Sequence, residues 1–191
     1  MKVVAFNGSP RPNGNTATLL KLALAEIEKA GIETELVQVG SRPIHGCSAC
    51  YKCKEKQNNR CIFDDDPVNE YIAKMVEADG ILLGSPTYFS DISAQMKAFI
   101  DRTGVVVRAN GNLLRRKVGA GVVAARRAGS VHAFSSLNYY FLIAEMIVPG
   151  SNYWNLGIRN APGDVLEDEE GLETVRQLGR NMAWTIEKLA G

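Results

Sequence analysis

The sequence lacks a dominant charge and long apolar runs. Its 22 Lys and Arg nearly balance its 21 Asp and Glu, so no basic stripe favours binding to nucleic acid by counterion release. The short basic runs at 115–117 and 126–127 are, taken alone, typical of solvated surface. The opening apolar run at 3–6 is far shorter than the roughly 18 residues of a membrane span. We therefore expect no signal peptide, no membrane contact and a cytoplasmic location.

Repeats and low-complexity tracts are also absent, and only four residues are cysteine. In a reducing compartment such cysteines are more often metal ligands or redox thiols than structural disulfides. A length of 191 residues suits one well-filled domain rather than two. We predict a single domain over 1–191, with a cysteine-rich insertion at about 40–66.

Short apolar runs alternate with amphipathic segments along the whole chain. Strands are expected at 2–6, 34–39, 80–84, 117–124 and 147–148, helices at 16–30, 67–78, 93–103, 131–146 and 169–189, and a loop from 151 to about 167. Continuous apolar strands are typical of a sheet covered on both faces, and right-handed crossovers place the helices there. The pattern predicts an α/β fold: a flavodoxin-like, doubly wound, five-stranded parallel sheet of order 2-1-3-4-5.

The segment 8–16 (GSPRPNGNT) joins the first strand to the first helix. It contains neither the lysine-bearing loop of triphosphate-binding proteins nor G-x-G-x-x-G. Its polar side chains are short hydrogen-bonding groups and one guanidinium, on Ser9, Arg11, Asn13, Asn15 and Thr16. With the positive end of the helix they suit a phosphomonoester. A plain helix cap at Asn15 or Thr16 is the alternative.

A second distinctive loop, 85–90 (SPTYFS), follows the third expected strand. In the order 2-1-3-4-5 the first and third strands are neighbours, so the loops that follow them flank one crevice. Pro86, Tyr88 and Phe89 offer a surface for a flat ring. The alternative is that these aromatic residues only pack against the next helix.

Together these motifs resemble the NADPH-dependent FMN reductase and iron–sulfur flavoprotein group. The resemblance includes SAQMKAFIDR at 93–102 and extends to the C-terminal helix. It implies that the five polar residues of 8–16 hold the FMN phosphate. It also implies that the isoalloxazine ring lies along Pro86, Thr87, Tyr88 and Phe89. The segment 125–129, with Arg126, Arg127 and Gly129, would lie near the pyrimidine edge of the flavin, where a cation stabilises the reduced ring.

The cysteines follow the pattern C-x2-C-x2-C-x7-C, at Cys47, Cys50, Cys53 and Cys61. The leading triplet matches the start of ferredoxin motifs and suits an iron–sulfur cube. Zinc is the second interpretation, because structural zinc sites more often pair two C-x2-C units across a longer spacer. Free or disulfide-forming thiols are the third. The neighbouring His45 is interpreted as a surface or packing residue. The resemblance implies a [4Fe–4S] cluster on the four cysteines.

The leading hypothesis is an FMN-dependent oxidoreductase that passes electrons between FMN and the cluster. No catalytic side chain is expected, because the isoalloxazine carries the chemistry. A cluster-free NAD(P)H-dependent FMN or quinone reductase is the alternative. A third hypothesis is a carrier module like flavodoxin, which the near-neutral charge disfavours.

The resemblance also implies which partners the chain meets. The electron donor would be ferredoxin or NAD(P)H, and the acceptors quinones, oxygen or other small oxidants. The chain would form a homodimer or homotetramer. The helix at 134–141, with Tyr139 and Tyr140, and the loop 151–160, with Trp154, are candidate contacts. The alternative is that both segments belong to the core.

Overall fold

The computed structural model describes all residues, 1–191. Five parallel strands form one sheet in the order β2-β1-β3-β4-β5, which confirms the predicted flavodoxin-like arrangement. The strands are β1 (Lys2–Asn7), β2 (Glu33–Gln38), β3 (Gly80–Pro86), β4 (Val118–Ala125) and β5 (Leu156–Ile158). The helices are α1 (Asn15–Lys29), α2 (Lys52–Lys56), α3 (Val68–Glu77), α4 (Ala94–Ala109), α5 (Ser130–Ile143), the 3₁₀ turn η1 (Asp164–Glu167) and α6 (Glu169–Ala190).

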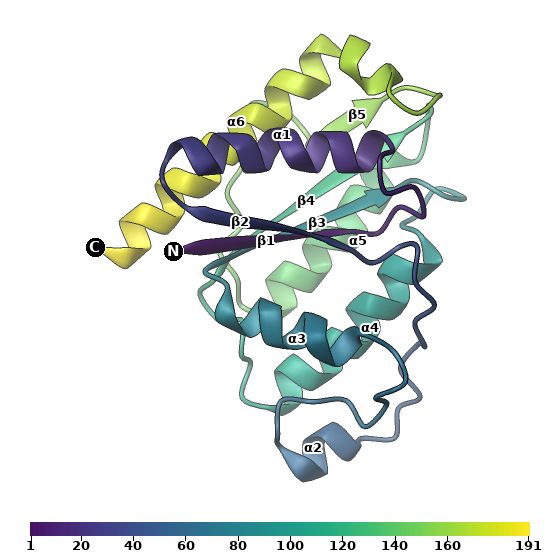
Figure 1. The fold of residues 1–191 in the computed structure, drawn as a ribbon, viewed down its shortest axis with the longest axis vertical. Coiled ribbons are helices and arrows are strands. Elements are labelled where there is room, and N and C mark those ends of the chain that lie inside the picture. The colour runs from purple at the N-terminus through teal and green to yellow at the C-terminus, as the bar shows by residue number, and fades with distance from the viewer.

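The sheet lies between two layers of helices. Figure 1 shows α1 and α6 on one face and α3, α4 and α5 on the other. Along β1, Val3 and Ala5 belong to the core under α1 and α6, whereas Val4 and Phe6 belong to the opposite core. Successive strand residues point to opposite faces, so an uninterrupted apolar run fills both cores.

The fifth strand lies later in the sequence than expected. The predicted strand at 147–148 supplies only an isolated parallel bridge between Ile147 and Val118, and β5 lies within the segment expected to be a loop. Ile147 does pair with the edge of β4, but Pro149, which follows shortly after, has no N–H group to continue a ladder. The chain leaves the sheet edge there and pairs with it again when Leu156 meets Val123.

The cysteine-bearing excursion lies between β2 and α3. In Figure 1 this segment, with α2, extends beyond α3 and α4 on the side away from the sheet. A small apolar cluster of Cys53, Val68, Ile72 and Val106 attaches it to α3 and α4. The excursion is therefore packed onto two helices and is not part of the sheet.

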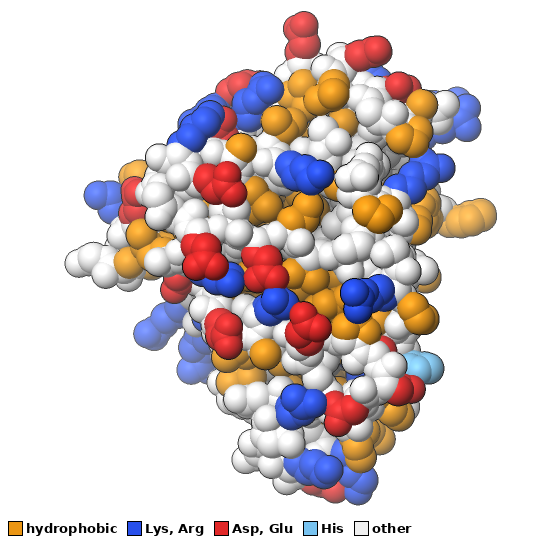
Figure 2. All heavy atoms as spheres, viewed as in Figure 1, with side chains coloured by type: hydrophobic (Ala, Val, Ile, Leu, Met, Phe, Trp, Pro, Cys, Tyr) orange, Lys and Arg blue, Asp and Glu red, His pale blue; other side chains and the backbone are white.

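The surface carries mixed charge. Figure 2 shows acidic and basic side chains interspersed over the visible face. None of the helices combines the length and the apolar character that a membrane span requires.

Candidate functional site

The loops that follow β1, β3, β4 and β5 surround a cavity of about 120 Å³ at the carboxyl edge of the sheet. We call it the loop cavity. Eight residues predicted from the sequence line it: Ser9, Arg11, Asn15, Thr16, Pro86, Thr87, Tyr88 and Arg126. The expectation that the loops after the first and third strands face one crevice is therefore met, and the loop after β4 joins them.

Hydrogen bonds fix the shape of the first loop. The side chain of Asn7 accepts from the Ser9 N–H at 3.1 Å, and Gln38 Nε2 donates to the Ser9 carbonyl at 2.7 Å. Gly40 passes so close that a Cβ atom there would lie 2.3 Å from the carbonyl oxygens of Gly8 and Ser9. Only glycine permits this approach. The loop is thus held from β1 and from the end of β2 before any ligand binds.

The loop cavity is strongly cationic. Arg11, Arg126 and Arg159 line it, and no carboxylate does. The hydroxyl of Thr87, also in the lining, is buried and has no hydrogen-bond partner within the chain. Buried polar groups are nearly always paired, so this hydroxyl is available to a ligand. The donor set fits a compact anion that carries polar substituents.

The side-chain amide of Asn15, which lines the cavity, is also held by two hydrogen bonds within the chain. Its Nδ2 donates to the Ala161 carbonyl at 2.9 Å, and its Oδ1 accepts from the Gly163 N–H at 2.8 Å. The amide therefore ties the start of α1 to the loop after β5. That loop supplies Arg159 and Asn160 to the cavity. Neither residue was predicted from the sequence, because the last strand was expected earlier in the chain.

Four other predicted residues, Asn13, Phe89, Arg127 and Gly129, lie outside the cavity lining. Phe89 is fully exposed at the tip of a turn, with a left-handed φ of 47°. Gly129 also has a positive φ, and a Cβ atom there would lie 2.7 Å from Ser90 Cα. Gly129 therefore allows the loop that carries Arg126 to pack closely against the loop that carries Phe89.

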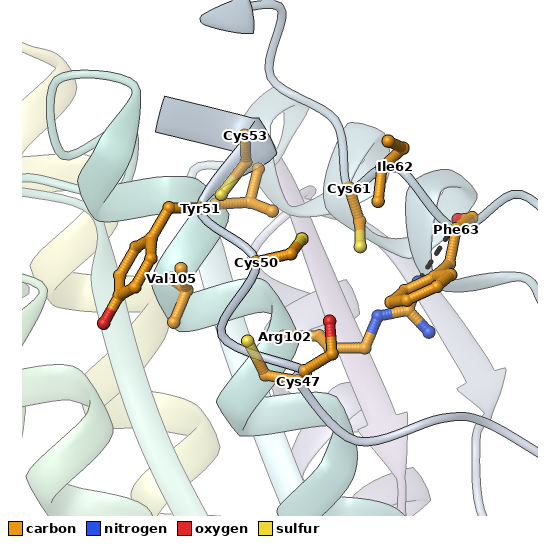
Figure 3. A pocket seen from close by; sticks show the side chains of 11 residues that line it. Cys47, Cys50, Tyr51, Cys53, Cys61, Ile62, Phe63, Arg102 and Val105 are labelled. Carbon is orange, nitrogen blue, oxygen red and sulfur yellow. Dashed lines mark hydrogen bonds between the residues drawn. The ribbon is translucent and has the colours of Figure 1, made fainter. Parts of the chain in front are cut away.

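The four cysteines surround a second, smaller cavity of about 20 Å³, which we call the cysteine cavity. Figure 3 shows Cys47, Cys50, Cys53 and Cys61 around it, with Arg102 of α4 in its wall. No residue lines both cavities. Cys61, separated by the longest gap in the motif, thus lies with the other three.

The backbone around the first three cysteines has an unusual form. Ala49 and Tyr51 adopt left-handed φ angles of 54° and 55°, whereas the intervening Cys50 does not. Holding two non-glycine residues in this region is costly, so the surrounding fold must maintain it.

The thiols differ in their tendency to ionise. The Lys52 N–H and the Ser48 hydroxyl donate to Cys50 and lower the pKa of its thiol, whereas burial raises the pKa of Cys53. No three cysteine sulfurs lie within 4.8 Å of one another, as the ligands of a single ion would. One group does meet that distance, His45 with Asp65 and Asp66, and there His45 is exposed and paired with Asp65 at 3.2 Å.

Asn69, at the start of α3, holds Cys61 in place and was missed by the sequence analysis. Its buried side chain accepts from the Cys61 N–H at 2.7 Å and donates to the Cys61 carbonyl at 3.0 Å. The same Nδ2 also donates to the Phe63 carbonyl at 3.0 Å. An asparagine in the first turn of a helix gives no specific signal in one sequence, so only the fold shows this role.

Comparisons with known proteins show the family and the fold of the chain. The family model described as NADPH-dependent FMN reductase matches residues 1–161. An iron–sulfur flavoprotein of Methanocaldococcus jannaschii is 42% identical over 193 residues, which cover 97% of each chain. An iron–sulfur flavoprotein of Methanosarcina thermophila is 33% identical and covers 98% of this chain and 96% of its own. RosB, solved with bound 8-demethyl-8-formylriboflavin-5′-phosphate, shares the fold with a TM-score of 0.77 at 21% identity, over 100% of this chain and 80% of its own.

Proposed function

This chain belongs to the NADPH-dependent FMN reductase family, whose members are FMN-dependent oxidoreductases, and from that premise we propose that it passes electrons between FMN and a cysteine-bound [4Fe–4S] cluster. The observation that carries the proposal is the gathering of all four cysteines around one cavity. FMN exchanges hydrides or single electrons, and a cluster exchanges one electron at a time, so the pair would link two-electron to one-electron chemistry.

The loop cavity would hold the FMN phosphate. Arg11 and the N-terminus of α1 would bind the phosphate oxygens, with Ser9 and Thr16 beside them. The buried hydroxyl of Thr87 would donate to the flavin or its ribityl chain. The ring would lie along Pro86 and Tyr88. Asn13, Phe89, Arg127 and Gly129 remain proposed neighbours of the ring and phosphate, at the rim rather than in the lining.

Arg126 is the cation that we assign to the reduced flavin. It follows β4 and lines the loop cavity, whereas its neighbour Arg127 does not. A guanidinium at the pyrimidine edge would stabilise the negative charge that the ring gains on reduction.

Cys47, Cys50, Cys53 and Cys61 would hold the cluster. The leading C-x2-C-x2-C triplet favours a cluster over zinc, because structural zinc sites more often pair two C-x2-C units across a longer spacer. The lowered pKa of the Cys50 thiol suits a thiolate ligand. Seven relatives of the chain, among them the two described above, are named as iron–sulfur flavoproteins.

The proposed electron donor is ferredoxin or NAD(P)H. The donors can be distinguished by mixing the oxidised protein with NADH, NADPH or reduced ferredoxin under anaerobic conditions and following the flavin absorbance. Rapid bleaching by NADPH in a protein without iron would support the cluster-free FMN or quinone reductase instead.

The proposal is tested by Cys50→Ala, which removes a ligand from the centre of the motif. We expect the variant to lose the broad brown absorption of the cluster and to keep the flavin bands, because the two cavities share no residue. Lys54→Ala, in the exposed part of α2, is the matched control and should keep both. A wild-type spectrum that contains flavin bands alone would refute the cluster.

A further inference from the structure

Arg102 is a fully buried cation in the wall of the cysteine cavity. It comes from α4, is only 1% exposed, and lines the cavity with the four cysteines. Figure 3 shows the Arg102 side chain passing Cys47, with its guanidinium against the Phe63 ring and below Cys61 in that view. A buried guanidinium is costly unless its charge and its donors are matched.

Most of the donors on Arg102 are matched within the chain. Nη1 forms an ion pair with the buried carboxylate of Asp66 and lies 3.4 Å from the His45 carbonyl, and Nη2 donates to the Phe63 carbonyl at 3.2 Å. The guanidinium carbon also lies 5.5 Å from the centre of the Phe63 ring. These contacts attach the segments on either side of the cysteine motif to α4.

One nitrogen of the Arg102 guanidinium has no hydrogen-bond partner. Arg102 Nε is buried and forms no hydrogen bond, whereas both terminal nitrogens are engaged. The carboxylate of Asp66 is itself satisfied, because it also accepts from the His45 and Val68 N–H groups at 3.0 and 3.2 Å. The free Nε–H therefore belongs to the one charged side chain that lines the cysteine cavity.

We propose that Arg102 tunes the cysteine site. Its buried charge and its free Nε–H would act on the bound cluster and raise the reduction potential of the cluster. Reduction adds one electron, and so one negative charge, to a cluster that four thiolates already make anionic. A fixed cation nearby stabilises the reduced form more than the oxidised form, and a hydrogen bond to sulfur acts in the same direction. This inference rests on the proposed cluster.

Asp66 allows a test of the direction in which the cluster potential shifts. Its carboxylate opposes the charge of Arg102, so removing the acid and removing the base should move the potential in opposite directions. We expect Arg102→Gln to lower the cluster potential and Asp66→Asn to raise it. Arg102→Lys keeps the charge without the Nε–H edge and should give an intermediate potential. If both residues only maintained the fold, opposite shifts would not occur.

The experiment is an anaerobic redox titration of the purified full-length protein, with the cluster followed by electron paramagnetic resonance and FMN by absorbance. Arg108→Gln, an exposed charge change on the same helix, is the control and should leave the cluster potential unchanged. The FMN potential serves as an internal reference in every variant, because Arg102 does not line the loop cavity.

The outcomes separate this inference from the proposed function. Wild-type protein without iron and sulfide overturns both. Wild-type protein with a cluster whose potential is unchanged in Arg102→Gln overturns the inference alone. If Arg102→Gln does not retain iron, Asp66→Asn decides: a raised potential supports the role of Arg102, and an unchanged or lowered one overturns it.

Discussion

Three arginines give the loop cavity its positive charge. Arg11 comes from the loop after β1, Arg126 from the loop after β4, and Arg159 from the loop after β5. Because no acidic side chain offsets them there, we expect the cavity to select FMN over riboflavin, which lacks the phosphate.

Arg11→Gln should weaken FMN binding about tenfold, the loss expected for one exposed charge-assisted hydrogen bond. Riboflavin binding should change little. Arg108→Gln is the matched control, because this arginine of α4 is exposed and lies outside the cavity lining. The measurement is flavin fluorescence quenching on titration into apoprotein. Equal losses for FMN and riboflavin would show that Arg11 does not bind the phosphate.

The sequence indicates candidate residues where a motif is contiguous, and it does not indicate them where the fold joins separate segments. The polar loop at 8–16 and the four cysteines could be found by their spacing alone. Arg159, Asn69 and Arg102 could not, because each acquires its role from contacts that only the folded chain makes.

The start of α4 links the two loops that were predicted to bind FMN. Ser93 caps this helix by accepting from the Met96 N–H at 3.2 Å, and its hydroxyl donates to the Gly8 carbonyl at 2.7 Å. Its own N–H donates to Ser85 Oγ at 2.9 Å. One buried serine therefore joins the ends of β1 and β3 to a helix.

Ser93→Ala should lower the free energy of unfolding by about 1–2 kcal/mol, because it removes both a helix cap and a buried hydrogen bond. FMN binding should weaken as the first loop loses a support. Ser135→Ala is the control, since that hydroxyl lies on the exposed face of α5 and bonds only to the Val131 carbonyl within its own helix. Denaturant titration of both variants gives the comparison, and equal stability of the two would contradict the structural role of Ser93.

The bounds of helices and strands with a strong periodicity of apolar residues were predicted to within a few residues, except at the end of α4 and around the fifth strand. The predicted helix at 93–103 continues to Ala109 in α4. The short β5 has only three residues with a glycine in the middle, too few to form a pattern. The turn of α2 was also missed, because its charged sequence has no apolar face beyond Cys53.

At the scale of the whole molecule, α5 exposes apolar residues that would remain in contact with water if the chain were a monomer. Tyr139, Leu142 and Ile143 are exposed, whereas Leu137 and Phe141 of the same helix lie in the core. The helix α5, which was predicted to contact another protomer, therefore has one face in the core and one face in solvent. Tyr139 and Ile143 also line a hollow of about 710 Å³ between α4 and α5. We expect this face to form the contact between protomers.

Tyr139→Glu should shift the protein from dimer or tetramer to monomer, because a buried carboxylate at an apolar contact is costly. Light scattering coupled to size-exclusion chromatography at micromolar concentration measures the change. Leu189→Glu, also at an exposed apolar position but at the end of α6, should leave the assembly intact. A wild-type protein that is already monomeric would refute the predicted assembly.

The central claim is that one chain holds both FMN and a four-cysteine cluster. The most direct test is to purify the full-length protein without oxygen and to measure flavin, iron and acid-labile sulfide per chain in the same sample. The account predicts about one FMN with about four iron and four sulfide. Protein that contains FMN with neither iron nor sulfide would contradict it and would leave a cluster-free flavin reductase.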